Sequence, residues 1–161
     1  MKDIIFLIKI KHEGKLELLD ASEEMGKSYL NKSESNLASA KILFENDKIE
    51  ETVSLAYYSA YNLLLSLLFK TGIKSENHLA TIILLKEIFD LDNSIIFFAK
   101  EERIKTQYYV DFDISKEQVI AIIREVEDFN GNFFDFISKL TSEKIDFCRN
   151  KFINMIQFEG K

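Results

Sequence analysis

One run of apolar positions constrains the fold of this 161-residue chain most. Between residues 119 and 140 the apolar residues recur in alternating steps of three and four, which places them on a single helical stripe. They are Val119, Ile122, Val126, Phe129, Phe133, Phe136 and Leu140. Ser115 and Gln118 stand just before the stripe with the spacing of a capping box. The pattern predicts a long helix that begins after Ser115 and buries one face.

The rest of the chain after residue 21 is also helical in pattern. Apolar residues spaced by three and four, together with polar starts and breaks, predict further helices over about 22–46, 49–70, 77–89, 93–108 and 142–158. Gly72 follows the second of these, where a left-handed residue commonly ends a helix. We therefore expect an all-α fold, an up-and-down bundle of four to six helices.

The first 20 residues have a different pattern. Two apolar segments, residues 4–8 and 16–19, flank a polar stretch that contains Gly14, and this arrangement is typical of a short β-hairpin. We expect one domain over 1–161, with the hairpin as an appendage at 1–20, the bundle at 21–140 and an extra helix at 141–161.

The run from Val53 to Phe69 holds 17 residues without a charge, the lower limit for a membrane-spanning helix. Polar residues such as Ser54, Asn62 and Ser66 interrupt it, and the pattern favours the central helix of a bundle over a membrane span. The first residues have no signal-peptide pattern, so we expect no membrane association and a cytoplasmic location.

Charge and composition exclude several kinds of site. The net charge of −6 argues against a broad basic surface for duplex nucleic acid. Cys148 is the single cysteine, so no internal disulfide can form, and its apolar helical position predicts a buried thiol. His12 and His78 are the two histidines. We expect no metal site and no cofactor.

Tyr57, Tyr58 and Tyr61 lie on consecutive turns of the helix predicted over 49–70. Aromatic residues at this spacing are usually core, but three buried hydroxyls need partners, and a polar cleft would supply them. His78 follows Lys74 at the start of the next helix. It either makes a capping contact or lies at a cleft edge, where the helix N-terminus would attract an anion such as phosphate.

Arg103 precedes Tyr108 and Tyr109 in the segment ERIKTQYYVDFD. It either pairs on the surface with Glu101, Glu102 or Asp111, or recognises a phosphate, for which a guanidinium is well suited. On a continuous helix residues 103 and 108 are about 140° apart. Their side chains would converge only if the helix unwound.

Taken in order, these motifs resemble the HEPN family (higher eukaryotes and prokaryotes nucleotide-binding domain), in particular its small stand-alone prokaryotic and archaeal members. The resemblance covers roughly residues 27–140. It rests on the order and spacing of Ala56-Tyr57-Tyr58, the leucines from Leu63 to Leu68, Gly72, Lys74, His78, Arg103 and Tyr108.

The resemblance implies a bundle of four or five helices that often forms a homodimer. Many family members are ribonucleases, usually toxins paired with a small nucleotidyltransferase antitoxin. Their motif joins an Arg, a polar residue and a His for metal-independent cleavage that uses the 2′-hydroxyl of the RNA. Here Arg103 matches the Arg, but Ile104 follows it and Tyr108 fills the His position.

Because a tyrosine has a pKa near 10, it is a poor general base. We therefore expect a non-catalytic HEPN-like module that dimerises and binds a partner protein, such as a minimal nucleotidyltransferase, or a nucleotide. The alternatives are a divergent ribonuclease using Arg103, Tyr108 and His78, and a purely structural oligomerising bundle. The expected binding residues are Lys74, His78, Arg103, Tyr108, Tyr109, Tyr57, Tyr58 and Tyr61.

Overall fold

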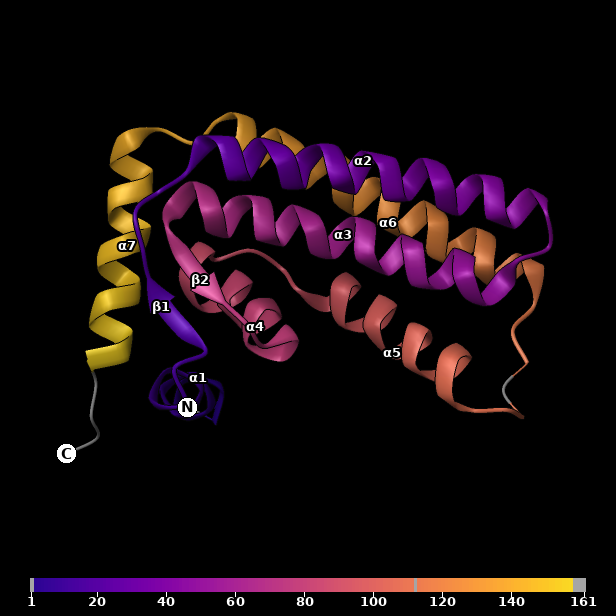
Figure 1. Ribbon diagram of the computed structural model, residues 1–161, viewed down its shortest axis with the longest axis horizontal. Helices are drawn as coiled ribbons and strands as arrows, with labels where there is room; N and C mark the ends of the chain where they lie inside the picture. Colours follow the sequence, from indigo (N-terminus) through magenta and orange to yellow (C-terminus); the bar gives the residue numbers. More distant parts are fainter. Residues whose placement is uncertain (1, 112, 158–161) are drawn as a thin grey trace. The chain divides into compact units, whose positions relative to one another are not determined.

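The computed structural model describes residues 2–111 and 113–157. In the part described, the fold is all-α, as predicted, with one small antiparallel sheet. The elements are α1 (Lys2–His12), β1 (Leu16–Leu18), α2 (Glu23–Glu45), α3 (Ile49–Thr71), β2 (Ile73–Ser75), α4 (His78–Phe89), α5 (Ser94–Tyr108), α6 (Lys116–Ser138) and α7 (Ser142–Gln157) (Figure 1).

The chain packs into two compact units. The first unit comprises Met1–Lys27, Leu64–Asn93 and Lys139–Lys161, and the second comprises Ser28–Leu63 and Ser94–Ser138. The boundary crosses α2 and α3, so each of these helices contributes to both units. All of α5 and α6 belongs to the second unit.

The predicted hairpin is wrong in its first half, because residues 4–8 lie in helix α1. The segment buries Leu7 and Ile10, which are three apart on one helical face, and its last turn is basic, which suits a helix C-terminus. Gly14 ends this helix with φ of 72°. The Gly14 N–H donates a hydrogen bond to the Lys11 carbonyl, and the Lys15 N–H donates one to the Ile10 carbonyl. This is the pattern of a glycine C-cap rather than of a hairpin turn.

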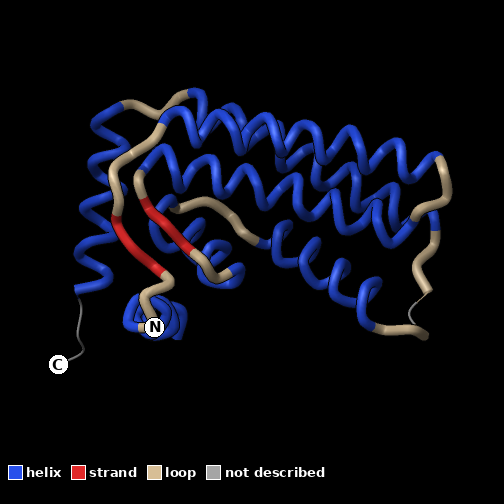
Figure 2. The backbone as a smooth tube through the Cα atoms, in the orientation of Figure 1, coloured by secondary structure: helices blue, strands red, loops and turns tan. Residues whose placement is uncertain are grey.

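The second half of the predicted hairpin is a strand, but its partner is distant in sequence. β1 pairs antiparallel with β2, with Leu16 opposite Ser75 and Leu18 opposite Ile73 (Figure 2). The helices predicted over 49–70 and 77–89 leave residues 73–75 between them without an assigned strand. The sheet therefore ties the N-terminal segment to the end of α3 rather than forming an appendage.

A side chain from α7 joins these segments of the first unit. Arg149 Nη1 donates hydrogen bonds to the carbonyl of Leu19, at 2.9 Å, and to that of Thr71, at 2.7 Å. Gly72 directly follows Thr71 and ends α3, as predicted, with φ of 70°. A Cβ on Gly72 would collide with the Arg149 guanidinium and with the Leu19 carbonyl. The extra C-terminal helix is thus part of the first unit's core, with Cys148 and Phe152 buried.

In the second unit α2, α3 and α6 share a buried polar contact. The Ser33 hydroxyl donates to the Ser59 carbonyl at 2.7 Å, and the Ser59 hydroxyl donates to the Ser33 carbonyl at 2.8 Å. Asn130 Nδ2 donates to Ser59 Oγ at 2.8 Å. These bonds fix the register of three helices that run alongside one another (Figure 1).

Helix α6 forms as its stripe predicts. Ser115 Oγ accepts a hydrogen bond from the Gln118 N–H, and Gln118 Oε1 accepts one from the Ser115 N–H, which completes the capping box. The stripe buries Val119, Val126 and Phe133. Its last predicted member lies outside the helix, because α6 ends at Ser138.

Helix α3 is long and apolar enough to cross a membrane, but 72% of its apolar window is buried inside the protein. That burial is typical of a core helix and accounts for the uncharged run from 53 to 69.

Candidate functional site

Helix α5 places one arginine against the aromatic face of α3. The Cζ atom of Arg103 lies 5.4 Å from the ring centroid of Tyr57 and 5.0 Å from that of Tyr58. At these distances the guanidinium is attracted by the electron-rich faces of both rings. We call Arg103, Tyr57, Tyr58 and Tyr61 the arginine–tyrosine cluster; all four belong to the second unit.

The three tyrosines form a connected set on α3. Tyr57 is fully buried, and its ring stacks on that of Tyr61 with centroids 5.7 Å apart. It meets Tyr58 edge-on at 5.2 Å. Burial, and secondarily the neighbouring Tyr61, raises the pKa of the Tyr57 phenol above its usual value. The phenol is therefore neutral at physiological pH and acts as an aromatic support, as expected for core tyrosines.

The side chain of Arg103 has hydrogen-bonding capacity left over. Its Nε is buried and has no hydrogen-bond partner among the described residues. Within residues 2–111 and 113–157 no carboxylate forms an ion pair with it; Glu102, one of the predicted partners, pairs instead with Lys105 at 2.7 Å. A guanidinium held on two rings without a counter-charge has the chemistry to bind an anion.

A groove of about 450 Å³ adjoins the cluster. Tyr58 belongs to both, because its ring supports the guanidinium and also lines the groove. The other lining residues are Leu43, Glu50, Glu51, Ser54, Leu55 and Gln107. The volume lies in the range of small-molecule sites in proteins.

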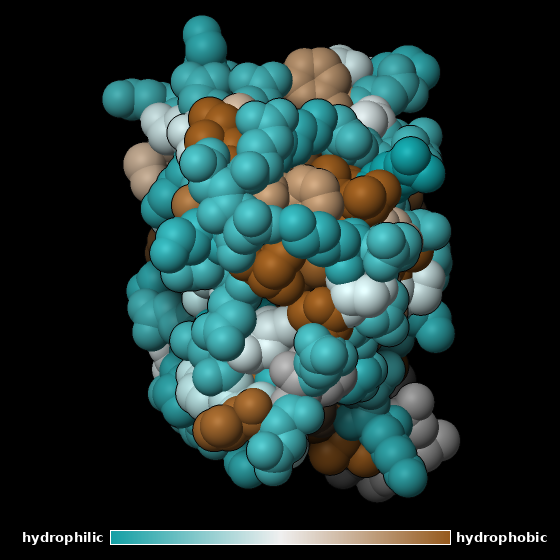
Figure 3. All heavy atoms as spheres, turned by 90° about the vertical axis from the view of Figure 1, so that its right-hand side faces the viewer, coloured by the Kyte–Doolittle hydropathy of each residue, from teal (hydrophilic) through white to brown (hydrophobic). Residues whose placement is uncertain are grey.

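Sequence reasoning missed most of this groove. Gln107 follows Arg103 by four residues on α5, and Glu51 precedes Tyr58 by seven on α3, so each shares a helical face with a predicted residue. That spacing was the available signal. The face drawn in Figure 3 is mostly hydrophilic, with hydrophobic side chains among the hydrophilic ones.

Tyr108 and Tyr109 are exposed and do not join the cluster. Helix α5 continues to Tyr108 without unwinding, so Tyr108 stays about 140° around the helix from Arg103. Tyr108 is 67% exposed and Tyr109 is 62% exposed. Tyr109 lines a shallow hollow of about 610 Å³ together with Glu101, Ile104, Lys105 and Asp111.

Lys74 and His78 belong to the first unit and are not part of the arginine–tyrosine cluster. Lys74 lies on β2 and pairs with Glu76 at 2.7 Å; the hydrogen bond to Glu76 raises the pKa of Lys74. His78 is the exposed first residue of α4. The capping role falls to Asn77, whose Oδ1 accepts a hydrogen bond from the Ala80 N–H at 2.9 Å.

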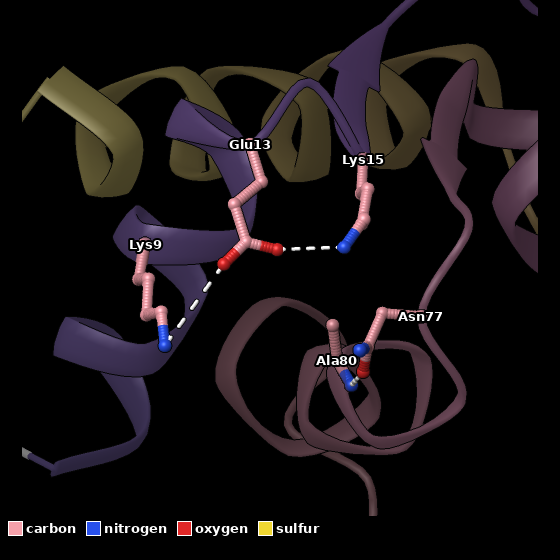
Figure 4. A network of polar contacts seen from close by, with 5 residues as sticks. All are labelled: Lys9, Glu13, Lys15, Asn77 and Ala80. Atoms are coloured by element: carbon pink, nitrogen blue, oxygen red, sulfur yellow. Dashed lines mark hydrogen bonds and ion pairs between the residues drawn. The ribbon is translucent and has the colours of Figure 1, made fainter.

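Figure 4 shows this part of the first unit, where Asn77 caps α4. Close by, Glu13 accepts a hydrogen bond from Lys15 at 2.8 Å, and Lys9 approaches its other oxygen at 3.9 Å. The Lys15 contact is the main cause that lowers the pKa of Glu13. These exposed pairs satisfy their charges locally, unlike Arg103.

Two further expectations concern metal and thiol chemistry. Among the described residues no group of three His, Cys, Asp or Glu side chains could hold a metal ion. Cys148 is buried, as predicted, and desolvation raises the pKa of its thiol. A raised pKa leaves little thiolate at neutral pH.

Comparison with known proteins supplies one match. The family model described as "HEPN domain" matches residues 27–131, which is more than half of the chain. No curated protein matches the chain. The matched range contains the whole arginine–tyrosine cluster and every residue that lines the adjoining groove.

Proposed function

Because the chain belongs to the HEPN family, we propose that it is a HEPN module that binds a nucleotide at the arginine–tyrosine cluster and does not cleave RNA in the manner of the family's ribonucleases. The observation that carries the proposal is the Arg103 guanidinium, which lies on two tyrosine rings with no carboxylate partner among the described residues.

The geometry supports phosphate recognition by this arginine. A guanidinium presents its N–H groups in a planar fork that matches two phosphate oxygens. Contact with the rings of Tyr57 and Tyr58 restrains that fork before a ligand arrives, so less side-chain entropy is lost on binding. The groove beside Tyr58 offers room for the rest of a nucleotide.

The non-catalytic part of the proposal is supported by the tyrosines of the cluster and by the residue at the family's His position, none of which is a suitable general base in the described structure. Tyr108, which fills the family's His position, is exposed and lies about 140° around α5 from Arg103. Tyr57, which does contact Arg103, has a raised pKa and so holds its proton tightly.

The proposal also includes a protein partner, either a second copy of the chain or a nucleotidyltransferase-type protein. It is supported by three exposed apolar side chains at the end of α5, those of Tyr108, Tyr109 and Val110. Exposed apolar groups that gather in one place are typical of interaction surfaces. Light scattering of the purified protein measures the self-association directly.

Isothermal titration with AMP and with ATP tests nucleotide binding. We expect at least one of the two to bind the wild type and neither to bind Arg103→Ala. Arg124→Ala is the matched control, because Arg124 is exposed on α6 and lines a different groove. Absence of binding by the wild type to both nucleotides would contradict the proposal.

Incubation with total cellular RNA in chelator tests the catalytic alternative. We expect equal, background-level cleavage by the wild type and by Arg103→Ala. Cleavage by the wild type that Arg103→Ala abolishes, while Arg124→Ala retains it, would replace the proposal with a divergent ribonuclease in which Arg103 stabilises the charged transition state.

A further inference from the structure

The groove beside the arginine–tyrosine cluster carries two carboxylates. Glu50 and Glu51 lie in the first turn of α3, where acidic residues interact favourably with the helix N-terminus. Both line the groove, and both are exposed. No lysine or arginine among the described residues forms an ion pair with either side chain. The groove is therefore negatively charged, although the cluster at its edge is positively charged.

This charge arrangement limits how many phosphates a ligand can carry. One phosphate satisfies the single guanidinium. Each additional phosphate charge gains only from Arg103 but is repelled by Glu50 and by Glu51. Two like charges about 10 Å apart in water disfavour each other by about a factor of two. A triphosphate therefore meets a net repulsion that a monophosphate avoids.

We infer that the site takes a nucleoside monophosphate and discriminates against nucleoside polyphosphates; this inference rests on the proposed function and names its ligand class. The phosphate binds the fork of Arg103, and the nucleoside occupies the groove. Carboxylates accept hydrogen bonds from sugar hydroxyls, which suits Glu50 and Glu51 to a ribose. The groove thus repels extra phosphates with the same groups that recognise the sugar.

The remaining lining residues are suited to a base. Leu43 and Leu55 provide apolar surface, and the ring of Tyr58 provides a face for stacking. The Gln107 amide, one helical turn after Arg103 on α5, offers a donor and an acceptor to a base edge. Only a ligand that joins one phosphate to a sugar and a base uses all of these groups.

Titration of the full chain with AMP, ATP, adenosine and inorganic phosphate tests the inference. We expect AMP to bind about fourfold more tightly than ATP, because ATP carries two more negative charges and each of them meets one more repulsive pair than attractive pair. Adenosine and inorganic phosphate should each bind more weakly than AMP. A 5′-phosphorylated tetranucleotide should bind no more tightly than AMP, because its further phosphates meet the same carboxylates.

Two variants isolate the role of the groove charge. Glu51→Gln removes one carboxylate without changing the size of the side chain. It should abolish the preference for AMP over ATP, a change of about fourfold, because each of the two extra charges of ATP then meets one repulsive and one attractive pair. Glu125→Gln, an exposed position on α6, should leave the preference unchanged. Circular dichroism establishes that both variants fold.

The outcomes separate this inference from the proposed function. ATP binding as tight as AMP binding, and lost in Arg103→Ala, would overturn the monophosphate assignment and leave nucleotide binding intact. Tighter binding of the tetranucleotide than of AMP would also overturn the assignment, in favour of an RNA end. Absence of binding by any nucleotide would overturn both.

Discussion

Two arginines in this protein differ in what their side chains contact. Arg149, on α7, donates from Nη1 to two backbone carbonyls, those of Leu19 and Thr71. Arg103, on α5, lies on two tyrosine rings, and its buried Nε has no partner among the described residues. Arg149 thus stabilises the first unit, whereas Arg103 in the second unit retains hydrogen-bonding capacity.

The contacts of the two side chains distinguish an arginine that stabilises the fold from one that is suited to binding. The contacts of Arg149 satisfy carbonyls at the end of α3 and after β1, so its removal damages the fold. The contacts of Arg103 orient the guanidinium without satisfying its donors. Arg149→Ala should therefore mainly lower the stability of the protein, whereas Arg103→Ala should mainly weaken nucleotide binding.

The largest effect is expected at Gly72, against which Arg149 is packed. Gly72→Ala should destabilise the protein by about 3 kcal/mol, because the residue has positive φ and the added Cβ meets the Arg149 guanidinium and the Leu19 carbonyl. Urea denaturation measures the change. Gly131→Ala is the control: its Cβ meets nothing within 4 Å, and α6 should gain stability. Equal stability of Gly72→Ala and wild type would show that the Arg149 contact is not tight.

Arg149→Ala should destabilise the protein by about 2 kcal/mol through the loss of two charge-assisted hydrogen bonds. Nucleotide binding by the folded fraction should not change. Thermal denaturation followed by titration with AMP measures both quantities. A stability loss no larger than that of Arg124→Ala would contradict the stabilising role of Arg149.

Ionisation of Tyr57 should lower the free energy of unfolding of the protein at high pH. Its folded pKa is raised above the unfolded value near 10, so the folded state keeps the proton longer. The stabilisation is complete below pH 10 and is lost as pH rises above it, with a slope of up to about 1.4 kcal/mol per pH unit. Tyr57→Phe should flatten the stability curve between pH 10 and 11. An unchanged slope in the variant would contradict the burial of this phenol.

The smallest effect on stability is expected for Arg103→Ala, about 1 kcal/mol or less, which corresponds to a partly exposed cation–π contact. Chemical denaturation beside Arg149→Ala provides the direct contrast. A larger loss at Arg103 than at Arg149 would reverse the assignment of structural and functional roles.

Local signals were sufficient to predict most of the helices. Ser115 with Gln118, and Gly72 at the end of α3, act within a few residues of the positions that they mark. The segment at 4–8 was misassigned because its β-branched residues favour a strand, whereas burial of Leu7 and Ile10 selects a helix. Strand β2 was missed because its partner β1 is remote in the sequence.

The site was predictable only as separate residues. Tyr57, Tyr58, Tyr61 and Arg103 were each selected from the sequence, but the contact between α3 and α5 depends on tertiary packing that no local pattern encodes. Gln107 could be assigned to the site only from the structure, in which it lines the groove together with Tyr58. The spacing between Arg103 and Tyr108 did not bring them together, because α5 stays helical to its end.

Chemical modification of the arginines measures whether Arg103 binds the nucleotide. The chain has three arginines, at 103, 124 and 149, and phenylglyoxal labelling with mass spectrometry follows each one in the same sample. We expect AMP to protect Arg103, Arg124 to be labelled equally with and without AMP, and Arg149 to be labelled slowly in both. Labelling of Arg103 at the same rate with and without saturating AMP would contradict it.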